Sequence, residues 1–207
     1  MYTGIIQTQG EITAVKPAKQ GGKIFQVRVG EKGYFSGVNI GDSVNLDGVC
    51  FTALEIKNDT VTFEAMPETL RLTTFGSARK GMVCNVEKSL SYSGTIGGHL
   101  LLGHVDGLAE VAEIRADGEY IRLYFRIPVA FHKFLAYKGT IAVNGVSLTI
   151  AEATAEGCAV ALISHTAKVT NLGRLNVGNK VNFEVDMMAR YVDRILSTYL
   201  LKNTHGK

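Results

Sequence analysis

Cysteine, proline and tryptophan are all scarce in this chain of 207 residues, which contains three, three and none of them respectively. Three cysteines cannot all form disulfides, and Cys50, Cys84 and Cys158 lack the close spacing of a zinc-binding motif. His99 and His104 are spaced poorly for a shared metal ion on a helix. We therefore expect neither a disulfide framework nor a metal centre, and free thiols favour a reducing, cytoplasmic location.

A strong charge of one sign and a long apolar run are also missing. The 22 basic and 19 acidic side chains leave a net charge of +3, and the dispersed basic residues argue against nucleic acid as a partner. No apolar stretch reaches the length of a membrane span, and residues 1–4 do not resemble a signal peptide, so no membrane partner is expected. The remaining composition is typical of a folded globular protein.

The chain contains an internal repeat. Residues 48–52, with the sequence GVCFT, return as residues 145–149, GVSLT, about 97 residues later. The same offset relates residues 69–76 to 166–173, and Gly81, Asn85 and Glu87 to Gly178, Asn182 and Glu184. A repeat of this length corresponds to a small whole domain. We therefore predict a first domain over residues 1–96, a second over 97–186, and a different C-terminal segment over 187–207.

Short apolar segments alternate with glycine-rich turns in both copies. Residues 24–29 show the apolar–polar alternation of a half-buried strand, and Asp47-Gly48 favours a tight hairpin. We predict an all-β fold in which each half is a six-stranded Greek-key barrel. The predicted strands of the first copy are 3–15, 24–29, a strand pair over 43–55 that is interrupted at Asp47-Gly48, 61–65 and 81–87. The second copy repeats this order with strands over 105–115, 120–127, 140–152, 157–163 and 180–185, and helical pieces are predicted at 66–76, 128–136 and 164–172.

The C-terminal segment has a different pattern. From Met187 onward, apolar side chains recur every three or four residues, at Met188, Tyr191, Val192, Ile195, Leu196, Tyr199 and Leu200. This spacing predicts an amphipathic helix. The helix could pack on its own subunit or against another one. We favour a subunit contact, because a continuous apolar stripe must be buried somewhere.

The motifs of both copies resemble those of the riboflavin synthase family, alpha-chain type, over almost the whole chain. They are MYTGII at residues 1–6, DGVCFT at 47–52, MPETLR at 66–71, GGHL at 97–100, GHVDG at 103–107, NGVSLT at 144–149 and VNFEVD at 181–186. The resemblance implies two similar six-stranded barrels and a C-terminal helix through which three subunits form a homotrimer. It also implies one substrate in each barrel, with the site formed between the first barrel of one subunit and the second barrel of a neighbour.

The implied reaction exchanges a four-carbon unit between two molecules of 6,7-dimethyl-8-ribityllumazine. One molecule becomes riboflavin and the other becomes 5-amino-6-(ribitylamino)uracil, without a metal, flavin or nucleotide cofactor. A methyl group of the lumazine must lose a proton and the ring must be attacked at a neighbouring carbon, so the protein has to orient two flat molecules and move protons. Some relatives also associate with a lumazine synthase shell, so the resemblance implies lumazine synthase as a possible partner.

Cys50 is the sharpest catalytic candidate, because it lies in the duplicated loop and matches the family's cysteine. Its predicted role is proton transfer or transient attack on the ring carbon, and the alternative is an ordinary buried thiol. Ser147, its partner in the repeat, is predicted to orient the other lumazine. Ser43 matches a family serine near the first ring, although a serine that merely begins a strand would look the same.

Two histidines extend the predicted site. His104 matches a residue that the family uses beside the first ring, and imidazole suits proton transfer near neutral pH, while the alternative is a solvated loop residue. His99, at the junction of the copies, is predicted to be either a hydrogen-bonding linker residue or a proton relay. His132 and His205 are predicted to be surface residues.

Thr52 and Thr149 follow Cys50 and Ser147 by two positions, so they share the same strand face and could bind the pyrimidine edges. The starts of the two short helices would suit ribityl hydroxyls and ring carbonyls. Through the resemblance, the other predicted substrate-binding residues are Gly4, Ile5, Ile6, Phe51, Glu64, Ala65, Met66, Pro67, Glu68, Thr69, Gly103, Val105, Lys138, Leu148, Ile163, Ser164, His165, Thr166, Ala167, Lys168 and Asp186.

The chain departs from the family pattern at a few positions. Tyr2 stands where the family usually has phenylalanine, so the aromatic ring is kept and a hydroxyl is added. Ala53 replaces a β-branched residue, and Ala167 replaces a common leucine. These changes affect the fine geometry of the pockets and remove no proposed catalytic group.

Two other functions compete with the enzyme. A non-catalytic lumazine- or flavin-binding antenna protein, as in luminous bacteria, would share the fold but has eroded second-copy motifs, whereas Ser147, Thr149 and Asp186 persist here. A duplicated scaffold that binds other proteins would leave the difference between Cys50 and Ser147 unexplained. The sequence therefore favours the enzyme.

Overall fold

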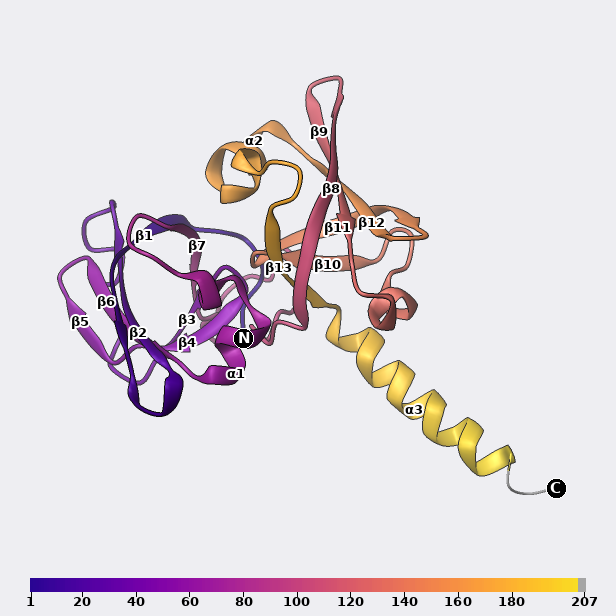
Figure 1. Ribbon diagram of the computed structural model, residues 1–207, viewed down its shortest axis with the longest axis horizontal. Coiled ribbons are helices and arrows are strands. Elements are labelled where there is room, and N and C mark those ends of the chain that lie inside the picture. Colours follow the sequence, from indigo (N-terminus) through magenta and orange to yellow (C-terminus); the bar gives the residue numbers. More distant parts are fainter. Residues whose placement is uncertain (205–207) are drawn as a thin grey trace.

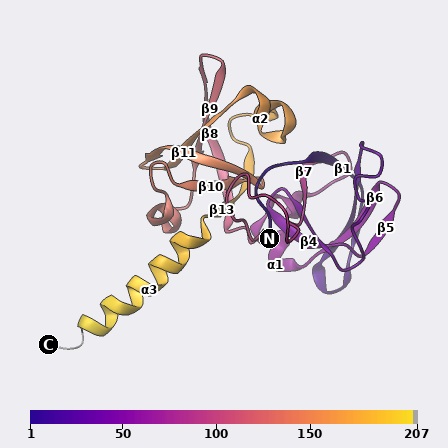
Figure 2. The same cartoon turned by 180° about the vertical axis from the view of Figure 1, so that it is seen from behind.

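The computed structural model describes residues 1–204, with side chains described up to Leu200. The end of the predicted tail, including His205, lies outside the described residues. Two β-sheet units stand next to each other, and a long C-terminal helix projects away from both (Figure 1). The view from behind shows the same arrangement, with the β8–β9 hairpin extending beyond the rest of the second unit (Figure 2).

The first unit is a seven-stranded antiparallel sheet in the order β4-β3-β7-β1-β2-β6-β5. Its strands are β1 (Thr8–Pro17), β2 (Lys23–Val29), β3 (Ser43–Leu46), β4 (Val49–Thr52), β5 (Glu55–Lys57), β6 (Thr60–Ala65) and β7 (Val83–Lys88). Its short helical pieces are η1 (Lys19–Gly21), α1 (Pro67–Leu72) and η2 (Thr74–Ser77).

The second unit is a closed barrel in the order β10-β11-β12-β9-β8-β13. Its strands are β8 (Gly107–Asp117), β9 (Tyr120–Arg126), β10 (Thr140–Val143), β11 (Val146–Thr154), β12 (Gly157–Leu162) and β13 (Lys180–Val185). Its helical pieces are η3 (Val129–Phe134), α2 (Ser164–Val169) and η4 (Asn171–Arg174), and the chain ends in α3 (Met187–Thr204). The predicted all-β duplication with a C-terminal helix is therefore confirmed.

The two units differ in one strand. The counterpart of β11 in the first copy is divided into β4 and β5, which are separated at Ala53 and Leu54. At the equivalent place β11 continues, but its pairing with β12 shifts register between Ile150 and Glu152. The irregularity that is a register shift within β11 is thus a complete interruption between β4 and β5. The first unit therefore has seven strands where the second has six.

The predictions for residues 3–15 and for His132 need correction. Residues 3–15 were expected to form one strand, but β1 begins only at Thr8, and the carbonyl oxygen of Gly4 accepts a hydrogen bond from Ser147 of the second unit. Residues 140–152, the counterpart of the predicted strand pair over 43–55, form the hairpin β10–β11, which turns at Asn144 and Gly145. His132 was expected at the surface, whereas it is half-buried and its Nε2 lies 2.8 Å from the carbonyl oxygen of Ile127.

The two equivalent hairpin turns touch each other. Asp47 and Gly48 have φ angles of 46° and 85°, and Asn144 and Gly145 have 45° and 75°, the left-handed conformations that a tight hairpin turn requires. A Cβ atom added to Gly48 would lie 2.9 Å from the nitrogen of Gly145. Glycine is therefore required both by the backbone conformation and by the close approach of the two units.

Side chains fill the interior of both units. In the first unit the aromatic rings of Phe25, Phe51, Phe63 and Phe75 contact one another, with Phe25 and Phe75 stacked at 5.2 Å between centroids. The second unit is filled by a corresponding buried cluster that includes Phe183. A substrate cannot sit inside such interiors. We therefore expect the lumazine of each barrel to bind on the outer wall of that barrel, outside its packed core.

The start of helix α3 is tied to the body of the protein. Arg190 donates a hydrogen bond of 2.8 Å to Asp106, and Asp193 forms an ion pair of 2.5 Å with Lys133. Farther along, the side chains of Ile195 and Tyr199 are 66% and 65% exposed. Among the helices of residues 1–204, none combines the length and the apolar character that spanning a bilayer requires.

A polar network joins the two units around their touching turns. Asp47 Oδ1 accepts hydrogen bonds from the backbone N–H of Asn85 at 2.8 Å and from the side chain of Asn171 at 2.9 Å. Asn182 donates to the carbonyl oxygen of Asp47, and Asn85 donates to that of Asn144. Burial raises the pKa of Asp47 to about 7, while the hydrogen bonds from Asn85 and Asn171 oppose the shift.

The raised pKa makes the stability of the protein depend on pH. A buried carboxyl that is easier to protonate in the folded state than in the unfolded state lowers the free energy of unfolding as pH rises from about 4 to 7. We expect Asp47→Asn to be more stable than the wild type at pH 8 by on the order of 2 kcal/mol, with a smaller difference at pH 5, in urea titrations. Asn144→Asp, at the equivalent position, should show the opposite trend. Equal pH dependence in wild type and Asp47→Asn would contradict this account.

Candidate active site

Two segments, residues 2–6 before the first sheet and residues 101–105 before the second, each cross over to contact the opposite unit. We call them the crossing segments. Tyr2 of one segment and Leu101 of the other form an antiparallel bridge, with backbone N–H···O bonds of 2.9 and 3.0 Å. Beyond this bridge, the carbonyl oxygen of Gly103 accepts a 2.9 Å hydrogen bond from the backbone N–H of Cys50 in β4. The segment that leads into the second unit therefore covers the cysteine of the first unit.

The N-terminal segment has the reciprocal contact. The carbonyl oxygen of Gly4 accepts a 2.9 Å hydrogen bond from the backbone N–H of Ser147 in β11. Ile6 packs against the hydrophobic core of the second unit, and Val105 packs against that of the first. The crossing thus places the predicted residues Gly4, Ile5 and Ile6 with the second site, and Gly103 and Val105 with the first.

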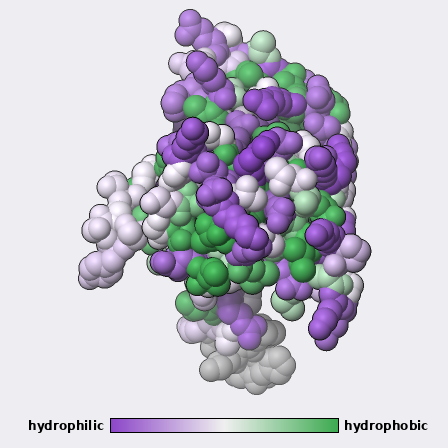
Figure 3. All heavy atoms as spheres, turned by 90° about the vertical axis from the view of Figure 1, so that its left-hand side faces the viewer, coloured by the Kyte–Doolittle hydropathy of each residue, from purple (hydrophilic) through white to green (hydrophobic). Residues whose placement is uncertain are grey.

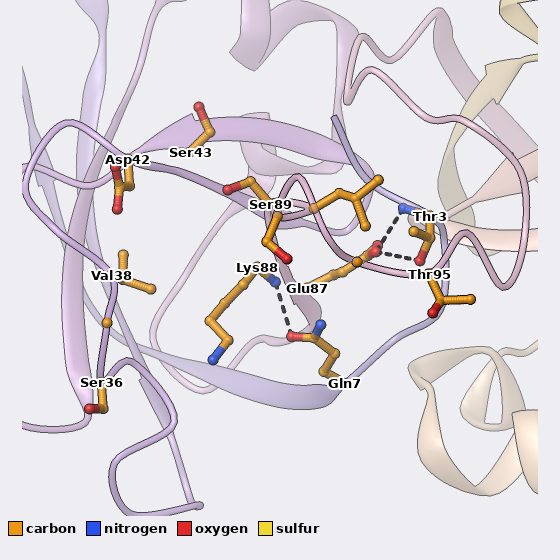
Figure 4. Close-up of a pocket in the computed structure, with 14 residues that line it drawn as sticks. Thr3, Gln7, Ser36, Val38, Asp42, Ser43, Glu87, Lys88, Ser89 and Thr95 are labelled. Atoms are coloured by element: carbon orange, nitrogen blue, oxygen red, sulfur yellow. Dashed lines mark hydrogen bonds between the residues drawn. The ribbon is translucent and has the colours of Figure 1, made fainter.

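Two buried carboxylates hold these crossing segments. Glu87 accepts hydrogen bonds from the backbone N–H and hydroxyl of Thr3 at 2.7 and 2.8 Å (Figure 4). It also accepts one from the N–H of Gly4 at 3.1 Å. Glu184, its partner in the repeat, accepts from the N–H groups of residues 102 and 103 at 2.9 and 3.0 Å. Burial raises the pKa of both carboxyl groups. The repeat had indicated this pair of glutamates without a role, and the structure supplies one.

Cys50 is half-buried on the outward face of β4. In the β3–β4 pair, Ser43 lies opposite Thr52 and Asn45 lies opposite Cys50, while the intervening side chains point into the core. The thiol opens into a cavity of about 200 Å³. This cavity is lined by Val49, Cys50, Glu68, Thr69, Leu72, Thr73, Gly103, His104 and Val105. The structure therefore brings together Cys50 and His104, two of the four predicted catalytic residues.

Ser43 lies in a different cavity. A pocket of about 420 Å³ next to β3 contains Ser43 together with Asp42, Glu87 and Lys88, and does not include Cys50 (Figure 4). The larger hollow of about 790 Å³ between the two units contains none of the predicted catalytic residues. Ser43 is thus a neighbour of the Cys50 site rather than part of the cavity that the thiol faces.

The second candidate site is built around Ser147. The side chain of His99 lies with Nδ1 2.7 Å from Ser147 Oγ. Burial lowers the pKa of His99, although the charge of Asp186 opposes this shift, so the neutral imidazole is favoured near pH 7. A neutral imidazole can accept the proton of the serine hydroxyl. The structure therefore supports the hydrogen-bonding interpretation of His99 and leaves it able to relay a proton.

Asp186 is predicted to bind substrate, but it also has a structural task. Its Oδ1 accepts a 2.9 Å hydrogen bond from the N–H of Met188 in the first turn of α3, and its other oxygen accepts from the hydroxyl of Thr140. An acidic side chain in this place stabilises the start of a helix. Lys138, the other charged residue predicted nearby, is exposed and has a φ angle of 64°.

Three side chains of the predicted substrate-binding set point into the hydrophobic cores. Phe51, Leu148 and Ala65 are buried in the hydrophobic cores, because the alternation along their strands places them on the inner face. Only their backbone groups can reach a ligand on the outer wall. The exposed or half-exposed members of the predicted set are Ile5, Ile6, Thr52, Glu64, Met66, Pro67, Glu68, Thr69, Val105, Lys138, Thr149, Ile163, Ser164, His165, Thr166, Ala167, Lys168 and Asp186.

Two of these exposed side chains already have partners. Glu68 forms an ion pair of 2.6 Å with Arg71, and Ser164 donates a 3.0 Å hydrogen bond to the carbonyl oxygen of Glu119. Seen from the side of β5 and β6, hydrophilic and hydrophobic side chains are intermingled on the surface of the first unit (Figure 3). Met66, at the start of α1, is 69% exposed, so this end of the site lies open.

Known proteins share both the sequence pattern and the fold. A family model described as a lumazine binding domain matches residues 3–89 and again residues 102–186. Riboflavin synthases of Photobacterium phosphoreum and Brucella abortus are 37% and 38% identical to the chain over 95% and 94% of its length, covering 89% and 98% of theirs. The chain belongs to the riboflavin synthase family.

A solved structure related to this family supports the same fold. The crystal structure of LumP complexed with riboflavin matches 90% of this chain and 100% of its own, with a TM-score of 0.81 and 25% sequence identity. The riboflavin synthase of Escherichia coli, at 35% identity over 93% of this chain, covers 90% of its own length. Each β-sheet unit is therefore a lumazine-binding domain of a riboflavin synthase, an enzyme of the transferase class.

Proposed function

We propose that the chain converts two molecules of 6,7-dimethyl-8-ribityllumazine into riboflavin and 5-amino-6-(ribitylamino)uracil by transfer of a four-carbon unit. The observation that carries this proposal is the 37–38% identity to riboflavin synthases over almost the full length of both chains. The presence of two related but different outer-wall sites, one with a thiol and one with a hydroxyl, supports it. Two substrates that react with each other require two such sites.

In this proposal Cys50 and His104 act on the lumazine of the first site. The thiol either transfers a proton or attacks the ring carbon transiently, and the exposed imidazole beside it exchanges protons with the ring or its methyl group. Ser147, with His99 at hydrogen-bond distance, orients the lumazine of the second site. Thr52 and Thr149, exposed on the same strand faces, bind the pyrimidine edges, and the residues at the starts of α1 and α2 bind the ribityl chains.

The assembly is also part of the proposal. The exposed apolar side chains of α3 support a homotrimer in which the first unit of one subunit faces the second unit of a neighbour. The domain boundaries 1–96, 97–186 and 187–207 and a cytoplasmic location, in keeping with three free thiols, are proposed on the same footing. We also propose lumazine synthase as a partner of this chain, and co-purification would test this association.

A binding protein without catalysis is the second candidate. It is favoured by the match to LumP in complex with riboflavin, although the identity to LumP is only 25%. The two functions separate when 6,7-dimethyl-8-ribityllumazine is the only reagent and riboflavin absorbance is followed. We expect turnover without any added cofactor. Tight lumazine binding with no riboflavin formed would reject the enzyme in favour of the binding protein.

A further inference from the structure

The thiol of Cys50 accepts a hydrogen bond from Tyr2, a residue that stands where the family usually has phenylalanine, which has no hydroxyl. The hydroxyl of Tyr2 lies 3.1 Å from Cys50 Sγ and donates to it. Tyr2 is fully buried between the two units, in a small cluster with Leu101, Ala142 and the thiol itself. Because the ring is buried and its backbone is paired with Leu101 on both sides, the hydroxyl is held in one place.

Burial keeps this hydroxyl protonated. Burial raises the pKa of Tyr2 above its ordinary value, the hydrogen bond and charge of Cys50 raise it further, and Ser43 opposes the shift while Glu87 adds to it. The phenol is therefore a permanent donor rather than a base. The charged or titratable side chains that line the cavity of the thiol are His104 and Glu68.

The second site lacks this arrangement. Leu101 has the place in the second crossing segment that Tyr2 has in the first, since each lies one residue before the segment held by its glutamate. Leucine has no hydroxyl, and Ser147 interacts with the imidazole of His99 instead. The phenol donor thus accompanies the thiol specifically, and it does not belong to the repeated plan of the fold.

We propose that Tyr2 is a positioning residue of the first site, whose hydroxyl orients the Cys50 sulfur and stabilises its thiolate form. The proposal rests on the proposed function for the use of that thiolate, but it concerns the thiol alone. A hydrogen bond to sulfur is stronger when the sulfur is charged, so the donor favours the thiolate over the thiol. In either role open to Cys50, the thiolate is the species that accepts a proton or attacks carbon.

Alkylation by iodoacetamide tests this without requiring turnover. Cys84 and Cys158 are fully buried, and burial raises the pKa of Cys158 to about 12, so the reactive thiol is that of Cys50. We expect Tyr2→Phe to move the pH profile of alkylation towards higher pH by about one unit, and to slow alkylation at pH 7 about tenfold. The variant loses one hydroxyl and keeps the packing of the ring, so it should fold, which thermal melting verifies.

Tyr34→Phe is the matched control. Tyr34 is another buried tyrosine of the first unit, and its hydroxyl donates a 2.6 Å hydrogen bond to Gln7. Its removal should leave the alkylation profile of the wild type unchanged. An unchanged profile in Tyr2→Phe, or equal displacement in both variants, would overturn the proposal. Because alkylation does not involve lumazine, this result is independent of whether the chain makes riboflavin.

Discussion

Removal of the Cys50 thiol lowers kcat for riboflavin formation by at least about a hundredfold, which is the result we expect for Cys50→Ala. A positioned group that transfers a proton in the transition state contributes roughly 10²–10⁴-fold to the rate. The side chain is half-buried on the outer wall and is smaller after substitution, so the core of the first unit is unaffected. Initial rates of riboflavin absorbance with the single lumazine substrate provide the measurement.

Two further variants make this result specific. Cys158→Ala removes a buried thiol from the core of the second unit, away from any proposed substrate, and should retain kcat within a few-fold of the wild type. Cys50→Ser keeps a small hydroxyl in place of the thiol and should restore little activity, because serine is a far poorer acid and nucleophile at neutral pH. Wild-type kcat in folded Cys50→Ala would remove the residue from the mechanism.

Loss of the apolar surface of α3 should abolish both assembly and activity. Ile195 and Leu196 are 66% and 55% exposed in the single chain, on the helix that projects away from both units. Replacing both with glutamate puts charges into the proposed subunit contact, where an unpaired buried charge costs several kcal/mol. We expect sedimentation to report a monomer instead of a trimer, and riboflavin formation to fall by at least about a hundredfold, because each site needs two subunits.

The matched control is Arg194→Ala, on the polar side of the same helix, which should leave both trimer and rate intact. Complementation adds a sharper measurement. Cys50→Ala and Ser147→Ala chains, inactive alone, should regain activity when unfolded together and refolded as mixed trimers, since an intact first site can then face an intact second one. A monomeric variant with wild-type kcat, or mixed trimers without activity, would contradict a site shared between subunits.

Local features of the fold were predictable because the residues that decide them are close in the chain. Asp47-Gly48 and its repeat form tight hairpins since both need left-handed backbone conformations that glycine and aspartate or asparagine accept. The alternation along the strands correctly placed Thr52 on the same face as Cys50 and Thr149 on the same face as Ser147, and in the structure these faces are the outer ones. The apolar spacing from Met187 onward produced α3 as predicted.

The same alternation places the side chains of Phe51 and Leu148 on the inner faces of their strands. Phe51 and Leu148 lie between outward-facing residues, so their side chains had to point inward, and the family motif alone carried them into the predicted site. The break between β4 and β5 has no comparable local signal, because the second copy accommodates the same position with a register shift.

The sequence alone determines the repeat, the two-domain plan and the terminal helix. It also determines which equivalent position has a thiol and which has a hydroxyl. The tertiary structure adds the crossing of the segments before each sheet, which puts Gly103 over Cys50 and Gly4 over Ser147. It also adds the contact between Tyr2 and Cys50, which are 48 residues apart. Such contacts depend on how two folded units pack against each other, and no periodicity within one segment encodes the position of a partner so distant in the chain.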